Sequence, residues 1–103
     1  MNIVEGKYYA NDHINLNGIK VTNVIKVISP GGNLRPEYND PFHVTETMSL
    51  EDGEFDSLIK MDWYEAYLER EATTDEAKKF EKYRKEVNNL KHRAEEVTGH
   101  WIK

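Results

Sequence analysis

The sequence contains no cysteine among its 103 residues, and it has only three prolines and six glycines. The absence of cysteine excludes disulfides, thiolate nucleophiles and cysteine-ligated zinc. Small secreted domains usually depend on disulfides, so we predict a cytosolic protein. No apolar run approaches the roughly 18 residues that span a bilayer. The opening MNIVEGKYYAND lacks the basic and apolar segments of a signal peptide.

Motifs for catalysis and for metal binding are also missing. The three serines lie outside a G-x-S-x-G context, and Gly31-Gly32 lacks the G-K-[ST] of a phosphate-binding loop. The acidic stretches lack the D-x-D-x-D-G spacing of a calcium loop. His92 and Glu96, one helical turn apart, supply only two metal ligands. We therefore expect no catalytic activity, no metal and no cofactor.

The charges that are present divide the chain into three parts. Residues 1–41 carry four basic and four acidic residues, residues 42–76 carry two and eleven, and residues 77–103 carry eight and four. The net charge is −5. Such an asymmetry indicates how a protein associates with charged partners and says little about its fold.

Alternation of apolar residues predicts strands in the first 61 residues. Asn17-Gly18, flanked by apolar residues, predicts a β-hairpin because both residue types tolerate a positive φ. The run from Ile19 to Ile28 alternates, which is typical of a strand with one face buried and the other partly buried. Ser29-Pro30-Gly31-Gly32 is expected to end this strand, because proline donates no ladder hydrogen bond.

A second hairpin is predicted further along the chain. FHVTETMSL (42–50) alternates again, and Asp52-Gly53 is a second turn motif. On the returning strand, Phe55, Ile59 and Met61 are expected on one face. The alternative, a helix that already begins within residues 54–61, stays open because short apolar runs are ambiguous.

The remaining sequence predicts helices. Asp62 with Glu65, and Thr73 with Glu76, have the spacing of capping boxes, so we expect one helix over 62–72 and a second over about 75–97. Gly99 is expected to end the second helix. The acidic first helix would fold back on the basic second one, pairing its glutamates with lysines. These residues are Glu65, Glu69 and Glu71 on the first helix, and Lys78, Lys82 and Lys85 on the second.

The second helix has an apolar heptad pattern, with steps of three and four residues. Its apolar positions are Phe80, Tyr83, Val87, Leu90, Ala94, Val97 and Trp101. This face either packs on the protein's own sheet or forms the seam of a homodimer, and the sequence leaves both open.

Together these elements predict an α+β fold in a single domain, residues 1–103. A small antiparallel sheet or partial barrel (1–61) would be followed by a helical hairpin (62–98) and a short tail (99–103).

Two surfaces are candidates for binding another protein. The long proline-rich connection 29–41 carries Leu34, Arg35 and Tyr38, and arginine and tyrosine are common among interface hot spots. The second candidate is a group of carboxylates around the predicted turn at Asp52-Gly53. It consists of Glu51, Asp52, Glu54 and Asp56.

Small acidic proteins without cysteine that are rich in Asn, Lys, Glu, Ile and Tyr resemble the accessory proteins of phages and mobile elements, anti-CRISPR proteins among them. The resemblance is one of composition and implies a protein that binds a larger host protein and modulates or inhibits it. A host protein that normally holds nucleic acid is one such partner, because the acidic surface would face its basic one. This is our leading hypothesis. One alternative is a nucleic-acid-associated regulator that uses Lys78, Lys82 and Lys85, because basic helices neutralise phosphates. Another is a structural subunit of an assembly.

Overall fold

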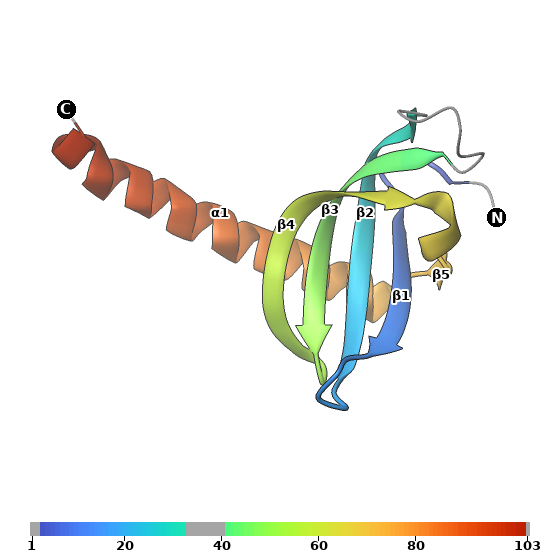
Figure 1. The fold of residues 1–103 in the computed structure, drawn as a ribbon. Helices are drawn as coiled ribbons and strands as arrows, with labels where there is room; N and C mark the ends of the chain where they lie inside the picture. Colours follow the sequence, from blue (N-terminus) through green and yellow to red (C-terminus); the bar gives the residue numbers. More distant parts are fainter. Residues whose placement is uncertain (1–2, 33–40, 103) are drawn as a thin grey trace.

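The computed structural model describes the backbone of residues 3–32 and 41–102, and the side chains of residues 3–29 and 41–88. In this part of the chain, five strands form one antiparallel sheet, and one long helix follows them (Figure 1). The elements are β1 (Tyr8–Ile14), β2 (Lys20–Gly32), β3 (Phe42–Glu51), β4 (Glu54–Tyr64), the 3-10 helix η1 (Glu65–Tyr67), β5 (Arg70–Glu71) and α1 (Thr74–Ile102). The sheet order is β4-β3-β2-β1-β5, so β4 and β5 lie at opposite edges although they are consecutive in sequence.

Both predicted hairpins are confirmed. The turn between β1 and β2 contains Gly18 at φ 77°, and the turn between β3 and β4 contains Asp52 at φ 51° and Gly53 at φ 81°. In the second turn, Asp52 and Gly53 are two consecutive residues with positive φ, as in a type I′ turn, whose twist matches that of the strands it joins. In the first turn Gly18 has a positive φ and Asn17 does not. The segment 54–61, which the sequence left open between strand and helix, is strand.

The strand β2 lies in the middle of the sheet, and apolar side chains on both of its faces are buried. Val24 lies on the face that α1 covers, which we call the helix face. Ile25 and Val27 lie on the other, which we call the opposite face. All three side chains are fully buried. The predicted alternation of this strand is therefore confirmed, and the sheet needs a cover on each side.

The helix α1 supplies the cover on the helix face. Phe80 is fully buried there and packs with Val24, Met48 and Leu50 of the sheet. Figure 1 shows that α1 crosses the sheet with its first half and continues beyond the edge formed by β4. The 29 residues of α1 span roughly 43 Å, which explains why the longest dimension of the molecule is 48 Å.

The cover on the opposite face comes from the chain that connects β4 to β5. Leu68 is buried there against Tyr9, Ile25 and Val27, and Trp63 packs against the same cluster. The buried Thr47 of β3 has a hydrogen-bond partner on this face, because Trp63 Nε1 of β4 donates to its Oγ1 at 2.8 Å.

The predicted helical hairpin is wrong, and with it the predicted fold class. Residues 62–72 form the end of β4, the single turn η1 and the short strand β5, which pairs with β1. The apolar residues of this segment have helical spacing, but Trp63 lies at the end of β4 and Leu68 follows η1, and these two pack on the opposite face of the sheet. The expected ion pairs with α1 do not form in the described part: Glu65 lies 3.2 Å from His43, and Glu71 lies 3.6 Å from Lys7.

The expected common face of Phe55, Ile59 and Met61 is also wrong. Leu50 pairs with Phe55 and Ser49 pairs with Ser57, so Asp56 is an extra residue in β4. This β-bulge moves Phe55 to the helix face, where its ring stacks on Tyr83 with 4.5 Å between the centroids.

Two expected strand and helix ends are corrected as well. The strand β2 does not stop at Ser29 but runs to Gly32, with irregular register after Val27 that leaves Pro30 without a ladder partner. The helix α1 continues past Gly99 to Ile102. Its start, in contrast, is confirmed as a capping box.

The capping box at the start of α1 has both reciprocal hydrogen bonds. The backbone N–H of Glu76 donates to Thr73 Oγ1 at 3.1 Å, and the backbone N–H of Thr73 donates to Glu76 Oε1 at 2.8 Å. Two N–H groups that a helix start leaves unpaired are thereby satisfied.

Replacing Phe80 by alanine should destabilise the protein by about 3–5 kcal/mol, since a fully buried aromatic ring leaves a cavity between α1 and the sheet. Urea denaturation followed by circular dichroism measures the change. Lys82→Ala, an exposed change on the same helix, should stay within about 0.5 kcal/mol of the wild type. Equal stability of the two variants would show that α1 does not hold the sheet.

Candidate functional site

Two turns lie side by side at one end of the sheet. The turn between β1 and β2 and the turn between β3 and β4 both lie at the lower end of the sheet in Figure 1. The backbone N–H of Asp52 donates to the carbonyl of Lys20 at 2.8 Å, which joins them. We call this end the double-hairpin tip and define it by two segments, residues 14–19 and 51–56.

The first turn is held by the side chain of Asn15. Its Oδ1 accepts hydrogen bonds from the backbone N–H groups of Asn17, at 2.9 Å, and of Ile19, at 3.0 Å. The backbone of Asn15 bonds to Ile19 and to Gly18 as well. An asparagine that bonds the backbone two residues on stabilises a turn in one conformation.

The second turn is braced by α1. Lys79 Nζ donates to the carbonyl of Gly53 at 3.0 Å. The helix that covers the sheet therefore also holds the end of the β3–β4 hairpin, and the tip is ordered without any partner.

Two large apolar side chains are exposed on this ordered tip. Leu16 is fully exposed and Ile14 is 65% exposed. An isolated exposed apolar residue is common in proteins and has no special meaning. Here Ile14 and Leu16 are two positions apart in the sequence, at a turn that four hydrogen bonds hold in place. Acidic residues of the second turn lie at the same end of the sheet.

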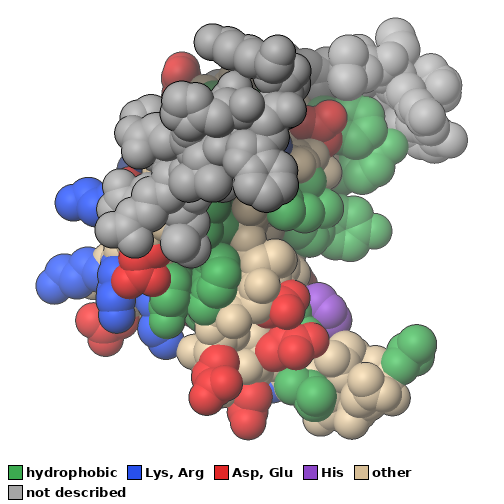
Figure 2. All heavy atoms as spheres, turned by 90° about the vertical axis from the view of Figure 1, so that its left-hand side faces the viewer, with side chains coloured by type: hydrophobic (Ala, Val, Ile, Leu, Met, Phe, Trp, Pro, Cys, Tyr) green, Lys and Arg blue, Asp and Glu red, His purple; other side chains and the backbone are tan. Residues whose placement is uncertain are grey.

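The four carboxylates predicted from the sequence are all exposed at the same tip. Glu51 and Glu54 are directly opposite each other across the turn. Like charges in such a pair destabilise a hairpin. Figure 2 shows acidic side chains gathered at the lower end of the molecule, beside hydrophobic ones. The tip therefore combines an apolar knob with a dense negative charge.

The other predicted protein-binding residues, Leu34, Arg35 and Tyr38, lie outside the described residues. Their role stays a prediction.

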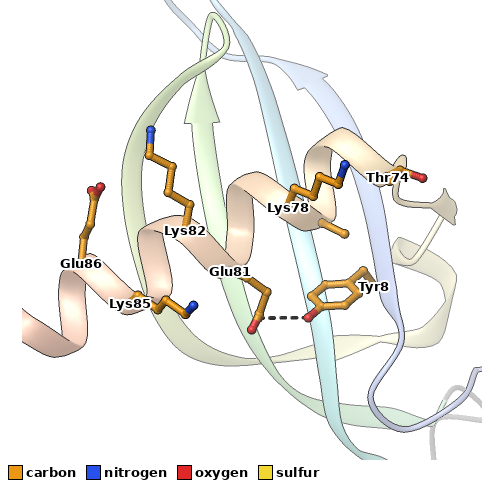
Figure 3. Close-up of a pocket in the computed structure, with 8 residues that line it drawn as sticks. Tyr8, Thr74, Lys78, Glu81, Lys82, Lys85 and Glu86 are labelled. Atoms are coloured by element: carbon orange, nitrogen blue, oxygen red, sulfur yellow. Dashed lines mark hydrogen bonds between the residues drawn. The ribbon is translucent and has the colours of Figure 1, made fainter.

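The three lysines of the alternative nucleic-acid site line an open groove of about 680 Å³ together with Tyr8 and Glu81. Figure 3 shows that Lys82 points away from Tyr8, that Lys78 extends along the helix toward Thr74, and that Lys85 extends toward Glu81. The ammonium of Lys82 lies 5.5 Å from the ring centre of Tyr83. The lysines thus do not converge on one point, as a site for a single phosphate would require.

Tyr8 in this groove is engaged from several sides. Its hydroxyl donates to Glu81 Oε2 at 3.0 Å, and Lys26 Nζ lies 3.7 Å from the same oxygen. Partial burial, and then the Glu81 carboxylate, raise the pKa of Tyr8 to about 12, because both disfavour the phenolate. Tyr8 is therefore a neutral hydrogen-bond donor at neutral pH and not a base.

A second charged cluster joins the start of α1 to β1. The Arg70 guanidinium donates to both oxygens of Glu76, at 2.7 and 2.8 Å, and to Asp12 at 3.1 Å. The hydrogen bonds from Arg70 hold the pKa values of Glu76 and Asp12 below their usual range. All members are paired with one another, so the cluster has a structural role.

No group of three or more histidine, aspartate or glutamate side chains with the geometry of a metal site occurs among the described residues. His43 is buried, and its Nε2 lies 3.2 Å from Glu65 Oε1. The side chains of His92 and Glu96 are outside the described set.

The residues that sequence reasoning missed are Leu16 and Ile14. They appeared there only as the apolar neighbours of Asn17-Gly18. The position of Leu16 directly before the predicted turn could have indicated its exposure. The side chain of a turn residue lies beyond the end of the sheet and cannot pack in the core.

Comparison with known proteins identifies no relative: no family model matches the chain, and no curated protein or solved structure is similar to it. In the part of the chain that the structure describes, no helix has the length and apolar character needed to cross a membrane. The fold and the tip therefore define the molecule only as a five-stranded antiparallel sheet with one C-terminal helix and a partly apolar, acidic end.

Replacing Arg70 by methionine should remove stability in a pH-dependent way. The pKa values of Asp12 and Glu76 are lowered in the folded protein, so their stabilisation is present above their ordinary values of 3.8 and 4.5 and is lost as the pH falls through the folded-state values. The wild type should exceed Arg70→Met in denaturation free energy at neutral pH, and the difference should shrink in acid. A difference that is constant with pH would contradict this pairing, and Glu69→Gln serves as the control.

Replacing Glu54 by lysine should stabilise the hairpin, because an attractive pair with Glu51 takes the place of a repulsive one. We expect a gain of about 0.2–1 kcal/mol in thermal or urea denaturation. Asp62→Lys, on the same strand but away from the tip, tests whether lowering the net negative charge has the same effect. An equal gain in that variant would mean that the Glu51–Glu54 pair is not the cause.

Proposed function

We propose that this protein is a non-enzymatic binding protein that docks on a larger protein through its double-hairpin tip and modulates it. The observation that carries the proposal is the full exposure of Leu16 on an ordered turn beside four carboxylates. Burying a leucine side chain contributes about 1.5–3 kcal/mol. This gain is still available to a complex, because Leu16 is fully exposed in the folded protein although Ile14 lies on the same tip.

The order of the tip favours this use. Association costs free energy for every loop and side chain that must be fixed in the complex, and preorganised surfaces avoid part of that cost. The turn at Asn15 is closed by its own hydrogen bonds, and Lys79 holds the turn at Gly53.

The charges indicate the partner's chemistry. A complementary surface would have an apolar pocket for Leu16, with lysine or arginine residues around it that face the acidic tip. Opposite charge steers such an encounter and disfavours wrong partners. The repulsion between Glu51 and Glu54 fits this role, because a partner's cation would relieve it.

Several finer expectations stay predictions. These are the inhibitory effect, the phage-type role and the cytosolic location, the last of which follows from the absence of cysteine. The nucleic-acid reading by way of Lys78, Lys82 and Lys85 and the assembly-subunit reading also stay predictions. We rank the nucleic-acid alternative lower because its three lysines diverge around their groove.

The test compares two matched variants in affinity capture from lysate of a candidate host, with and without nuclease treatment. The double variant Glu51→Lys/Glu54→Lys reverses the charge at two positions of the tip. It keeps a like-charge pair across the turn, so the free energy of unfolding should change little. Glu5→Lys/Glu69→Lys makes the same change in net charge at exposed positions away from the tip. Leu16→Ser removes the exposed leucine side chain and leaves the charges of the tip unchanged.

The proposal predicts that one stoichiometric protein is retained by the wild type and by the Glu5/Glu69 variant. It should be lost, or bound at least tenfold more weakly, with the tip variant and with Leu16→Ser. Equal retention by all four proteins would contradict docking through the tip. Loss of every captured protein on nuclease treatment would favour the nucleic-acid alternative.

A further inference from the structure

The strand β4 forms a long free edge of the sheet. It is 11 residues long, and within the described residues its ladder partner is β3 alone. The other edge is different, because β5 adds to β1 there and Arg70 bonds to Asp12 beside it. A free edge presents unpaired backbone N–H and C=O groups to any extended chain that approaches.

The helix α1 extends over this edge. In Figure 1 it crosses the sheet and continues past β4, on the side where a further strand would lie. A groove of about 500 Å³ lies between the two elements. It is lined by Leu58, Ile59 and Lys60 of β4, by Arg84, Val87 and Asn88 of α1, and by Glu46 of β3. A strand next to β4 would therefore be roofed by α1.

The groove has both apolar and charged surface. Leu58 is half-buried and Ile59 is 52% exposed. Arg84 already has a partner, because its Nε donates to Glu46 Oε2 at 3.0 Å, and this bond raises the pKa of the guanidinium. Lys60 is exposed and has no ion pair among the described residues, so its charge is available to a ligand.

We propose that the edge of β4 accepts an extended segment of another protein as an additional antiparallel strand beneath α1. Adding a strand to a free edge is a common way to bind peptides, in which backbone hydrogen bonds give affinity and alternate side chains give specificity. The proposal concerns a second surface and does not depend on the double-hairpin tip.

The side chains of β4 specify the sequence that fits. Leu58, Lys60 and Asp62 follow one another on the helix face at the two-residue period of a strand. An antiparallel segment would place an apolar residue opposite Leu58, an acidic residue opposite Lys60 and a basic residue opposite Asp62. Read from its N-terminus, it has the pattern basic-x-acidic-x-apolar.

A second copy of this protein is a poorer occupant. Two copies joined by β4 around Leu58 to Lys60 would be related by a two-fold axis at this edge. Both α1 helices would then cross the same edge on the same face, and residues 84–88 of each would compete for one space. A segment without such a helix avoids that collision.

The probe is a fluorescein-labelled peptide with the core Lys-Val-Glu-Val-Leu, flanked by threonines, and the readout is fluorescence anisotropy. We expect saturable binding to the wild type. Changing the peptide's glutamate to lysine should weaken binding about tenfold, and Lys60→Glu in the protein should reverse this preference. Lys78→Glu, an exposed change on the other side of α1, should have no effect. If the reversed charge in Lys60→Glu disturbs folding, Lys60→Gln replaces it, and the preference for the glutamate peptide should then disappear.

A peptide with N-methylated amides at the positions that face β4 separates strand addition from other binding in the groove, since it cannot form the ladder. Loss of binding on N-methylation is the expected result. No saturable binding of the unmodified peptide up to about 1 mM, or binding that N-methylation and Lys60→Glu leave unchanged, would overturn the proposal. Light scattering of the protein alone tests the other possible occupant, a second copy of the protein. A dimer that Lys60→Glu dissociates would show that β4 pairs with a second copy instead.

Discussion

The burial of both faces of β2 is the constraint on which the rest of the structure depends. Val24 on the helix face and Ile25 and Val27 on the opposite face are fully buried. A single sheet cannot shield both of its faces from water, so the chain must supply two covers. Phe80 on α1 and Leu68 in the crossing between β4 and β5 are the central residues of these covers.

The two covers also determine which surfaces stay free. The crossing carries the chain from one edge of the sheet to the other, where β5 pairs with Tyr9 and Ala10 of β1. The edge of β4 is left open, with α1 extending past it (Figure 1). The end of the sheet with the two turns is left free as well, and α1 reaches it through Lys79. Both proposed binding surfaces are thus held in place by the same helix that completes the core.

The sequence was informative where a local motif determines local geometry. Asn17-Gly18 and Asp52-Gly53 have the backbone preferences that a tight turn requires. Thr73 and Glu76 form reciprocal hydrogen bonds with each other at the start of α1. The carboxylates of the tip were found for the same reason, since they flank a turn that could be located.

The errors arose where distant parts of the chain decide the local structure. Trp63 at the end of β4 and Leu68 in the crossing after it pack on the opposite face of the sheet because that face needs a cover, and periodicity within residues 62–72 cannot show that need. The bulge at Asp56 turns Phe55 toward α1 by one inserted residue, which reverses every face assignment that is counted across it. Leu16 was passed over because exposure is a property of the folded chain.

The central claim is that the protein contacts its partner through the double-hairpin tip. The most direct measurement places a photo-crosslinking amino acid at position 16 and, separately, at position 69, and exposes each protein to light in nuclease-treated host lysate. The account predicts a single covalent adduct from position 16 and none from position 69. Adducts of equal yield from both positions, or an adduct from position 69 alone, would contradict it.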